Sequence, residues 1–502
     1  MTASIPPASP SAEVPASGVP ATAAHPRGIY TLFFTEMWER MSYYGMRALL
    51  VLYMVDTLKG GMGFPDKIAN SIYGLYTCAV YLVALPGGWI ADRLLGQQQA
   101  VMVGGIIIAL GHFTLAYPSP SAFFLGMLLV ILGTALLKPS VSSVAGQLYP
   151  EGGARRDAGF TLFYMGVNLG GFLGPLVCGY LADRLGWHWG FAAAGVGMTG
   201  GVIQYSLTRR HLGHAGSQPS NPSNTPGRDW AIVFAALGII ALVVTFSMTG
   251  AIRINPVGVA DYASWTIAGV AAVWFVYAFA LAGLTATEKK RLSVVAILFG
   301  TSALFWSGFE QAGSSMNLFA KRYTQLHYFN WDIPAAWFQS INSACILIFA
   351  PVFSWLWLGL AQRKITPSIS AKFSFGLVLL AAGFLVMFFG SKLALAVGQV
   401  SPLWLITTYL LHTWGELALS PVGLSAVTKL APAKLTAQTM GIWFLASSLG
   451  NLLAGRLAGE VTGENAGQMP VQFMHVVIMA AVVAVALAIF AKPLRRLASG
   501  AE

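Results

Sequence analysis

The sequence predicts an all-α membrane protein that crosses a lipid bilayer about fourteen times. Of its 502 residues, 56% are hydrophobic and only 9% are charged, whereas a soluble protein carries about 25% charged residues. Apolar runs recur from near residue 28 to near residue 494, and each is long enough to cross a hydrocarbon core of about 30 Å. Within lipid the backbone must satisfy its own hydrogen bonds, and runs of this length do so as helices.

Each expected span is an apolar run that polar, charged, Pro or Gly residues separate from the next. The spans are predicted near residues 28–57, 68–92, 97–116, 121–147, 155–183, 188–208, 229–249, 258–284, 293–323, 334–361, 370–390, 401–428, 435–460 and 470–492. Several exceed the thickness of a bilayer, which indicates tilt or extension beyond it.

One connection, residues 211–228 (HLGHAGSQPSNPSNTPGR), is polar and low in complexity and is interpreted as a flexible linker. Two spans and a charged loop follow it, so the plainest organisation is six spans, two extra spans and six more, with two repeated halves around a central cavity. The expected segments are an unstructured N-terminal tail 1–27, a six-helix bundle 28–208, a cytoplasmic linker 209–228, an additional helix pair 229–287, a second six-helix bundle 288–494 and a C-terminal tail 495–502.

The net charge of +11 indicates membrane topology rather than nucleic-acid binding. Lys and Arg collect in alternate connections, such as those with Arg155–Arg156 and Lys289–Lys290–Arg291, and in the C-terminal tail. Because basic residues accumulate in cytoplasmic loops, both termini are predicted to be cytoplasmic. The chain shows no nucleic-acid motif, and its three cysteines are widely spaced in apolar segments, so no metal site is predicted.

Eight ionisable side chains interrupt the apolar runs. They are Glu36, Glu39, Glu310, Glu416, Arg40, Arg47, Lys138 and Arg456. Each costs about 2.5–3.5 kcal/mol at the centre of a bilayer, so such groups usually line a substrate, ion or proton path. Arg456 has no acidic partner that the sequence identifies, so we expect it to have a structural role, as a long side chain that reaches the interface or bonds to carbonyl groups.

The stretch 36–47 carries Glu36, Glu39, Arg40 and Arg47 at helical spacing, along one stripe with Tyr43 and Tyr44. The alternatives are an internal salt bridge that only neutralises buried charges and a group that takes up and releases a proton. Two carboxylates beside an arginine are suited to the second role, because a salt bridge that moves changes proton affinity.

The charges also differ between the halves. Arg47 and Lys138 lie in the first half, and Glu310 and Glu416 lie in the second. If the halves face each other, the pocket between them is polarised.

Motifs in both halves resemble known transporters. Gly88–Arg93 (GWIADR), with its weaker echo at 179–184 (GYLADR), is similar to the loop signature of the major facilitator superfamily. Glu-x-x-Glu-Arg-x-x-Tyr-Tyr-Gly at 36–45 resembles the first-helix signature of the proton-dependent oligopeptide transporters. Further matches are GTALLKP at 133–139, RDAGFTLFYMGVNLG at 156–170, Phe309-Glu310-Gln311, Gln339-Ser340-x-Asn342 and Gly415-Glu416-x-x-x-Ser420-Pro421. The resemblance covers about residues 28–492, and the extra helix pair is typical of bacterial members. Met41 and Ser140 depart mildly from the family pattern.

The resemblance implies roles for individual residues. Glu36, Glu39, Arg40, Lys138 and Glu310 would couple transport to protons, and Glu310 would pair with a base such as Arg47 when it is unprotonated. Arg47 and Lys138 would face the carboxylate of a peptide, and Glu416, with Asn342 beside it, would face the ammonium group. The other expected contacts with the substrate are Tyr43, Tyr44, Tyr81, Tyr164, Asn168, Trp306, Glu310, Ser420, Trp443 and Phe444.

The resemblance therefore implies a major facilitator fold and symport of di- and tripeptides with protons across the inner membrane, by alternating access. The alternative is proton-coupled transport of nitrate or another organic anion on the same fold. No Walker-type loop and no hydrolase motif is present, so the proton gradient is the expected energy source, no cofactor is expected, and the protein is not predicted to be an enzyme. We expect a functional monomer in the bilayer.

Overall fold

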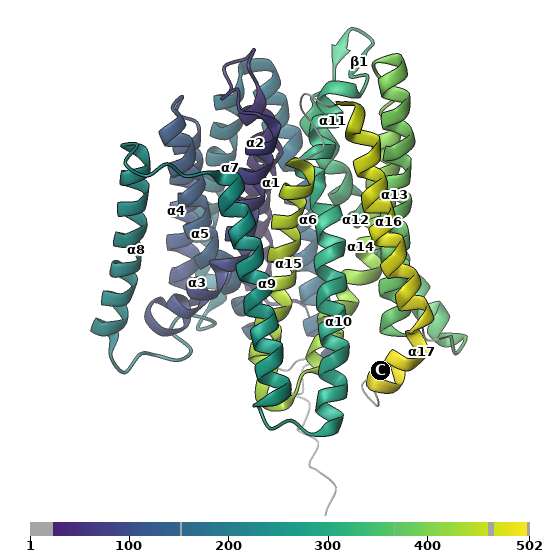
Figure 1. Cartoon of the computed structure of the whole chain (residues 1–502). Coiled ribbons are helices and arrows are strands. Elements are labelled where there is room, and N and C mark those ends of the chain that lie inside the picture. The colour runs from purple at the N-terminus through teal and green to yellow at the C-terminus, as the bar shows by residue number, and fades with distance from the viewer. Residues whose placement is uncertain (1–23, 151–152, 366, 460–465, 499–502) are drawn as a thin grey trace, which may run out of the picture.

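The computed structural model describes residues 24–150, 153–365, 367–459 and 466–498, and its long helices lie roughly side by side (Figure 1). Ten helical segments in these ranges are long and apolar enough to cross a membrane. Helices α1, α7, α14 and α15 also have the length, 22 to 29 residues, so fourteen segments match the predicted spans. The predicted all-α membrane fold is confirmed, while most of the predicted N-terminal tail, residues 1–23, lies outside the described residues.

The first half contains seven α-helices. They are α1 (Arg27–Val55), α2 (Asp66–Leu82), α3 (Ala84–Ile90), α4 (Gln97–Leu115), α5 (Pro120–Gln147), α6 (Gly153–Leu185) and α7 (Trp187–Thr208). Helices α2 and α3 and the π-helical turn η1 (Ala91–Leu95) form one span with a break at Val83. Pro86 lies just after the break and has no N–H to donate to the carbonyl of Leu82. A short 3-10 turn, η2 (Arg209–Leu212), ends this half.

The second half begins after the extra pair α8 (Pro226–Met248) and α9 (Pro256–Ala280). Its elements are α10 (Ala286–Phe309), η3 (Glu310–Gly313), α11 (Ser315–Tyr323), β1 (His327–Tyr328), β2 (Trp331–Asp332), η4 (Ala335–Gln339), α12 (Ser340–Gln362), α13 (Ile369–Val397), α14 (Leu403–Leu430), η5 (Ala433–Leu435), α15 (Thr436–Gly459), η6 (Ala466–Gln468), α16 (Met469–Ile489) and α17 (Ala491–Ala498). Strands β1 and β2 form a small antiparallel hairpin in which Tyr328 pairs with Trp331. Helix α17 crosses the boundary predicted at residue 495, so the expected C-terminal tail begins as helix.

Helix α1, which carries most of the predicted site, is packed closely against α6. Three glycines of α6 at four-residue spacing, Gly166, Gly170 and Gly174, each lie against a backbone carbonyl of α1. A Cβ atom added at Gly166 would lie 2.7 Å from the carbonyl oxygen of Phe33, and the other two sites are tighter. Small residues let transmembrane helices approach to backbone contact. The α1–α6 contact therefore fixes the position of the charged stripe.

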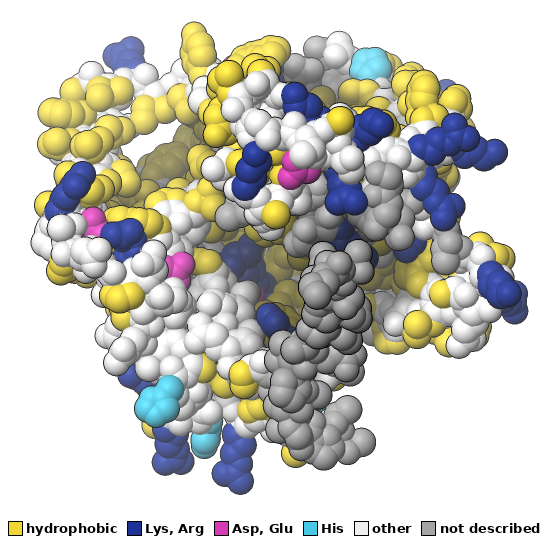
Figure 2. All heavy atoms as spheres, turned by 90° about the horizontal axis from the view of Figure 1, so that it is seen from below, with side chains coloured by type: hydrophobic (Ala, Val, Ile, Leu, Met, Phe, Trp, Pro, Cys, Tyr) yellow, Lys and Arg dark blue, Asp and Glu magenta, His cyan; other side chains and the backbone are white. Residues whose placement is uncertain are grey.

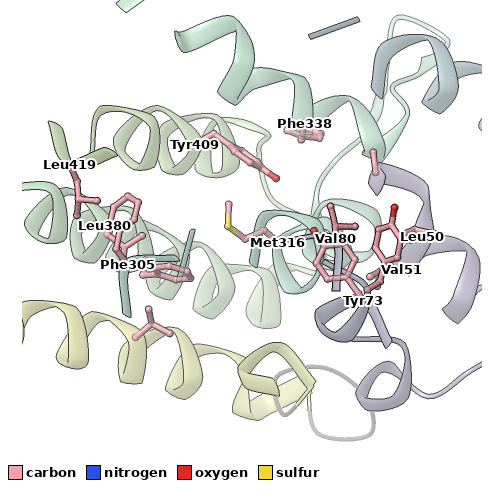
Figure 3. Close-up of a cluster of buried hydrophobic side chains, with 14 of the residues drawn as sticks. Leu50, Val51, Tyr73, Val80, Phe305, Met316, Phe338, Leu380, Tyr409 and Leu419 are labelled. Carbon is pink, nitrogen blue, oxygen red and sulfur yellow. The ribbon is translucent and has the colours of Figure 1, made fainter. Parts of the chain in front are cut away.

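The two halves meet along seams where α2 packs against α15 and α6 against α12. A single cluster of buried apolar side chains runs across this interface, and Figure 3 shows Tyr73 and Val80 of the first half beside Met316 of the second. Dispersion contacts of this kind hold helices together in lipid, where burial of apolar surface gives no driving force.

The extra pair is asymmetric. Helix α9 packs against both α2 and α15 and so covers the seam, whereas only 6% of the apolar window of α8 is buried, and this helix stands apart from the body in Figure 1. Arg456 of α15 forms an ion pair with Asp261 of α9, with 2.7 Å between Nε and Oδ1. The sequence did not identify this partner for Arg456, because Asp261 lies almost two hundred positions away in the chain.

The connection 209–228 is held against the first half rather than left free. The side-chain amide of Gln98 donates to the carbonyl oxygens of Gly213 and Ala215, at 3.0 and 2.9 Å. The hydroxyl of Ser220 donates to the carboxylate of Asp92 at 3.0 Å. The prediction of a flexible linker is therefore corrected, since Gln98 of α4 and Asp92 of η1 hold the connection against the first half.

Candidate functional site

A cavity of about 1270 Å³ lies between the two halves, lined mainly by α6, α12 and α14. Four of the predicted substrate residues, Tyr164, Asn168, Glu416 and Ser420, are part of its lining. Asp157, Lys429 and Arg495 are also part of its lining, near the end of the molecule where α17 lies. Figure 2 shows this face, on which Lys and Arg side chains gather. The cavity thus joins one end of the molecule to four of the predicted substrate residues.

The charged cluster of α1 is almost fully buried. Arg40 Nε lies 2.7 Å from Glu36 Oε1 and 3.0 Å from Glu39 Oε2. Glu39 is 0% exposed, and among the described residues neither of its carboxylate oxygens has a hydrogen-bond partner. One guanidinium therefore faces two carboxylates on its own helix, so the cluster can accept a proton without leaving a buried positive charge unpaired.

Lys138 approaches this cluster from α5 without joining it. Its ammonium lies 4.1 Å from the centre of the Tyr81 ring. It interacts electrostatically with Glu39, yet within the described ranges no carboxylate oxygen lies within ion-pair distance of its Nζ atom. A cation over a ring is stabilised by the ring's quadrupole. Lys138 is thus held against Tyr81 of α2, beside the α1 cluster.

Arg47, two turns further along α1, pairs across the interface. Its Nη2 atom donates to Oε2 of Glu310, and its Nε atom donates to the hydroxyl of Tyr73 at 2.5 Å. Glu310 lies in η3, where the helix breaks between α10 and α11, and both members of the pair are buried. The pairing of Glu310 with Arg47 is therefore present in the structure, and it links the first half to the second.

Glu416 lies in α14, on the wall of the cavity. The side-chain nitrogen of Asn342 in α12 donates to Oε2 of Glu416 at 2.9 Å and to Oγ1 of Thr413 at 3.1 Å. No basic group lies within ion-pair distance of Glu416 among the residues that the structure describes. A carboxylate held by one amide nitrogen and facing a cavity is suited to bind a cation.

The end of the interface away from the cavity mouth is closed. Arg322 of α11 forms a two-pronged ion pair with Asp66 of α2, at 2.6 and 2.8 Å. Asn317 of α11 donates to the carbonyl oxygen of Ala48 at 2.9 Å, and Asn70 of α2 donates to that of Ala458 at 3.1 Å. All these bonds join the two halves, so the structure has one open end and one sealed end.

The hairpin β1–β2 lies beyond this seal. The guanidinium of Arg184 in the first half is 5.6 Å from the Trp331 ring centre. A hydrogen bond from His327 holds the pKa of the Asp332 carboxyl below its usual value. The hairpin therefore places charged side chains next to the sealed end.

The remaining aromatic residues predicted for the substrate lie outside the cavity lining. Tyr43 is buried against Tyr76, with 6.4 Å between ring centres, and Trp306 packs against Phe305 and Phe309. Trp443 is buried beside Phe373, whereas Phe444 is 45% exposed. Tyr44 lies under Arg47, with 5.8 Å from the guanidinium to the ring. Their contact with a substrate stays a prediction.

Sequence reasoning missed Tyr73, Thr413 and the Asp66–Arg322 pair. Each is polar and within or beside an apolar span, which was the available signal. Their partners lie on other helices, so the sequence could not show what they bind.

The fold and site define a membrane transporter of the major facilitator class, built around a cavity between two halves whose mostly apolar wall carries a few polar groups such as Glu416 and Asn168. A family model described as the POT family (PTR2) matches residues 98–470. The peptide transporter YePEPT of Yersinia enterocolitica is 42% identical over 95% of this chain and 96% of its own length. A di-/tripeptide transporter of Lactococcus lactis is 37% identical over 84% of this chain and 87% of its own.

A solved structure is also similar. It is a mutant form of the peptide transporter POT in complex with alafosfalin, with a TM-score of 0.87, 39% identity and coverage of 97% of this chain and 98% of the other. The chain belongs to the POT family. The resemblance predicted from its motifs is confirmed, and the protein is a transporter rather than an enzyme.

Proposed function

We propose that this protein carries di- and tripeptides, together with protons, across the inner membrane by alternating access. The observation that carries the proposal is the cavity wall at Glu416. This carboxylate faces a space large enough for a peptide, has no basic partner among the described residues and is held by Asn342. It provides a site for an ammonium group, which every unmodified peptide carries. The names of the relatives point to the same cargo.

The opposite pole of the site would be Arg47 and Lys138. An arginine can bind both oxygens of a carboxylate through its planar fork. In the structure Arg47 is occupied by Glu310, so it becomes available to a peptide only when Glu310 is neutralised. Protonation of Glu310 would release Arg47 and thereby couple the proton to the substrate. Aromatic and apolar walls around the fixed charges would accept varied side chains.

The α1 cluster would hold the second proton-binding group. Glu36 and Glu39 share Arg40, so one of them can be protonated while the other keeps the pair intact. Lys138 is placed to respond to this change, because it already interacts electrostatically with Glu39. The proton gradient is the proposed energy source, and no cofactor takes part in the proposal.

The open end is assigned to the cytoplasm and both termini with it. The Lys and Arg side chains on this face support the assignment, because basic residues accumulate on the cytoplasmic side. The structure would then be the inward-open state, with the Asp66–Arg322 seal on the outside. The proposed working unit is the monomer, since each chain contains both poles of the site, and light scattering in detergent with a matched uptake assay tests it.

Uptake of labelled dialanine into proteoliposomes tests the cargo. We expect accumulation above the equilibrium level only with an inward proton gradient, with competition by other dipeptides and none by free amino acids. Transport of nitrate or another organic anion is not favoured, because Glu416 would repel a plain anion. Gradient-driven uptake of nitrate without uptake of dialanine would overturn the cargo assignment.

A further inference from the structure

Glu416 depends on a side chain that can be placed in two ways. The amide of Asn342 presents either its nitrogen or its oxygen to a neighbour, and the two placements occupy nearly the same volume. The nitrogen donates a hydrogen bond to a carboxylate, whereas the oxygen would repel it. The neighbour that decides between the two placements therefore decides the electrostatics of Glu416.

Thr413 is that neighbour. It lies in α14 one turn before Glu416 and is completely buried. Its hydroxyl donates to the backbone carbonyl of Tyr409 at 2.7 Å. A carbonyl oxygen has no hydrogen, so this bond must use the single proton of the threonine hydroxyl. Its oxygen is then an acceptor and nothing else.

An acceptor at this position excludes one placement of Asn342. The amide atom that lies 3.1 Å from Thr413 Oγ1 must carry a hydrogen, so it is the nitrogen. The second hydrogen of the same nitrogen then points to Glu416 Oε2, at 2.9 Å. With the oxygen turned inward, both Thr413 and Glu416 would face a second acceptor, which leaves buried lone pairs unsatisfied.

We propose that Thr413 is a positioning residue that fixes the nitrogen of the Asn342 side chain toward Glu416 and so presents Glu416 to the ammonium group of a peptide. The chain of bonds runs from the Tyr409 carbonyl through Thr413 and Asn342 to Glu416. The part of the inference that concerns the peptide rests on the proposed function. The fixed amide does not, because it follows from the hydrogen bonds alone.

The test uses Thr413→Val, which keeps the shape and removes the hydroxyl, and Thr413→Ser, which keeps the hydroxyl. Thr408→Val is the matched control: this threonine lies on the same helix, is equally buried and bonds to backbone carbonyls of Gly383 and Trp404. We expect Thr413→Val to raise the KM for dialanine about fivefold to tenfold, the effect of a lost hydrogen bond to a charged network. Thr413→Ser should restore it, and Thr408→Val should leave it within about twofold of wild type.

A variant that only destabilised the fold would not change the preference of the transporter for substrates with a free ammonium group. We therefore also expect Thr413→Val to reduce the preference for dialanine over N-acetyl-dialanine in competition assays, with no such change in Thr408→Val. An unchanged preference and an unchanged KM in Thr413→Val, with wild-type uptake intact, would overturn the proposal.

A measurement without substrate separates this inference from the cargo assignment. The thermal unfolding midpoints of Thr413→Val, Asn342→Ala and the double variant form a cycle. We expect the two effects to be non-additive, since either change breaks the same chain of bonds. Non-additive midpoints without dialanine uptake by the wild type would refute the cargo and keep the fixed amide. Additive midpoints would refute the fixed amide whatever the cargo.

Discussion

Two buried arginines on the same helix, Arg40 and Arg47, differ in where their partners lie. Arg40 is neutralised by Glu36 and Glu39 on α1 itself, whereas Arg47 is neutralised by Glu310 in the other half. The first arrangement persists however the halves move. The second exists only while the halves are close at that level. A proton bound at the first site changes local charge, and a proton bound at the second also changes whether the halves hold together.

The largest effect is expected where the proton site is independent of the opposite half. Glu39→Gln should abolish gradient-driven accumulation of dialanine, because Glu39 is completely buried and is one of the two carboxylates that pair with Arg40 in the part of the chain that the structure describes. Exchange of labelled for unlabelled dialanine without a gradient should continue. Both are measured in proteoliposomes.

Asp157→Asn is the control for that variant, because this carboxylate also lines the cavity but lies outside the α1 cluster. It should keep accumulation. If Glu39→Gln accumulated dialanine like the wild type, the α1 cluster would be a structural ion pair only.

The pair across the halves should give a smaller loss. Glu310→Gln removes the charge that holds Arg47, so we expect gradient-driven uptake to fall about tenfold, the equivalent of about 1.4 kcal/mol. The variant should depend less on external pH than the wild type does. Initial rates over a series of external pH values measure both effects.

Asp66→Asn changes a carboxylate that pairs with Arg322 at the sealed end. It therefore serves as a comparison for Glu310→Gln, not as a control for proton coupling. If Glu310→Gln kept full proton-driven uptake while Glu39→Gln lost it, the share of Glu310 in coupling would be refuted. The two arginines would then differ in geometry but not in function.

The seal itself should respond more weakly. Asp66→Asn replaces a bidentate ion pair by a weaker hydrogen bond. Because the Arg322 side chain is 36% exposed, this change should lower the stability of the closed state by about 1 kcal/mol. We expect the population open at the sealed end to rise about fivefold. Spin labels at Leu58 and Phe329, which are 92% and 102% exposed on opposite halves, report the distance between them.

Lys67→Gln is the control for the seal, since it changes a neighbouring charge that forms no ion pair with the other half among the residues that the structure describes. An unchanged distance distribution in Asp66→Asn would mean that apolar packing alone closes that end.

The smallest effect is expected at the brace between α9 and α15. Arg456→Gln breaks an ion pair whose side chains are 35% and 43% exposed, so it should cost less than about 1 kcal/mol. The unfolding midpoint should fall by no more than about 4 °C, and uptake should stay within about twofold of wild type. The charge-swapped pair, Arg456→Asp with Asp261→Arg, should recover the midpoint. A large loss of uptake in Arg456→Gln would assign the extra helices a direct part in transport.

The fold could be predicted from the sequence because lipid imposes a simple rule on each span separately. A run of about 20 apolar residues becomes a helix whatever its neighbours are. The charged site residues were identified for the same reason, since a buried charge such as Glu310 is conspicuous against apolar surroundings.

What could not be predicted depends on which faces of distant helices meet. Arg456 and Asp261, or Asp66 and Arg322, are separated by about two hundred residues or more, and no local pattern relates them. Thr413 was missed because a threonine within a helix usually bonds only its own backbone. The connection 209–228 was misjudged because its polar composition suggested freedom, while backbone carbonyls hold it to Gln98.

The glycines at 166, 170 and 174 have a consequence for how this protein can change over generations. A single added methyl group at any of them would push α6 away from α1 and displace the charged stripe. Substitutions at these three positions should therefore be poorly tolerated. Helix α8 is in the opposite situation, because only 6% of its apolar window is buried, so almost any apolar residue would serve there. Mutations should therefore accumulate unevenly, quickly along the helix that stands apart and slowly along the two whose backbones touch.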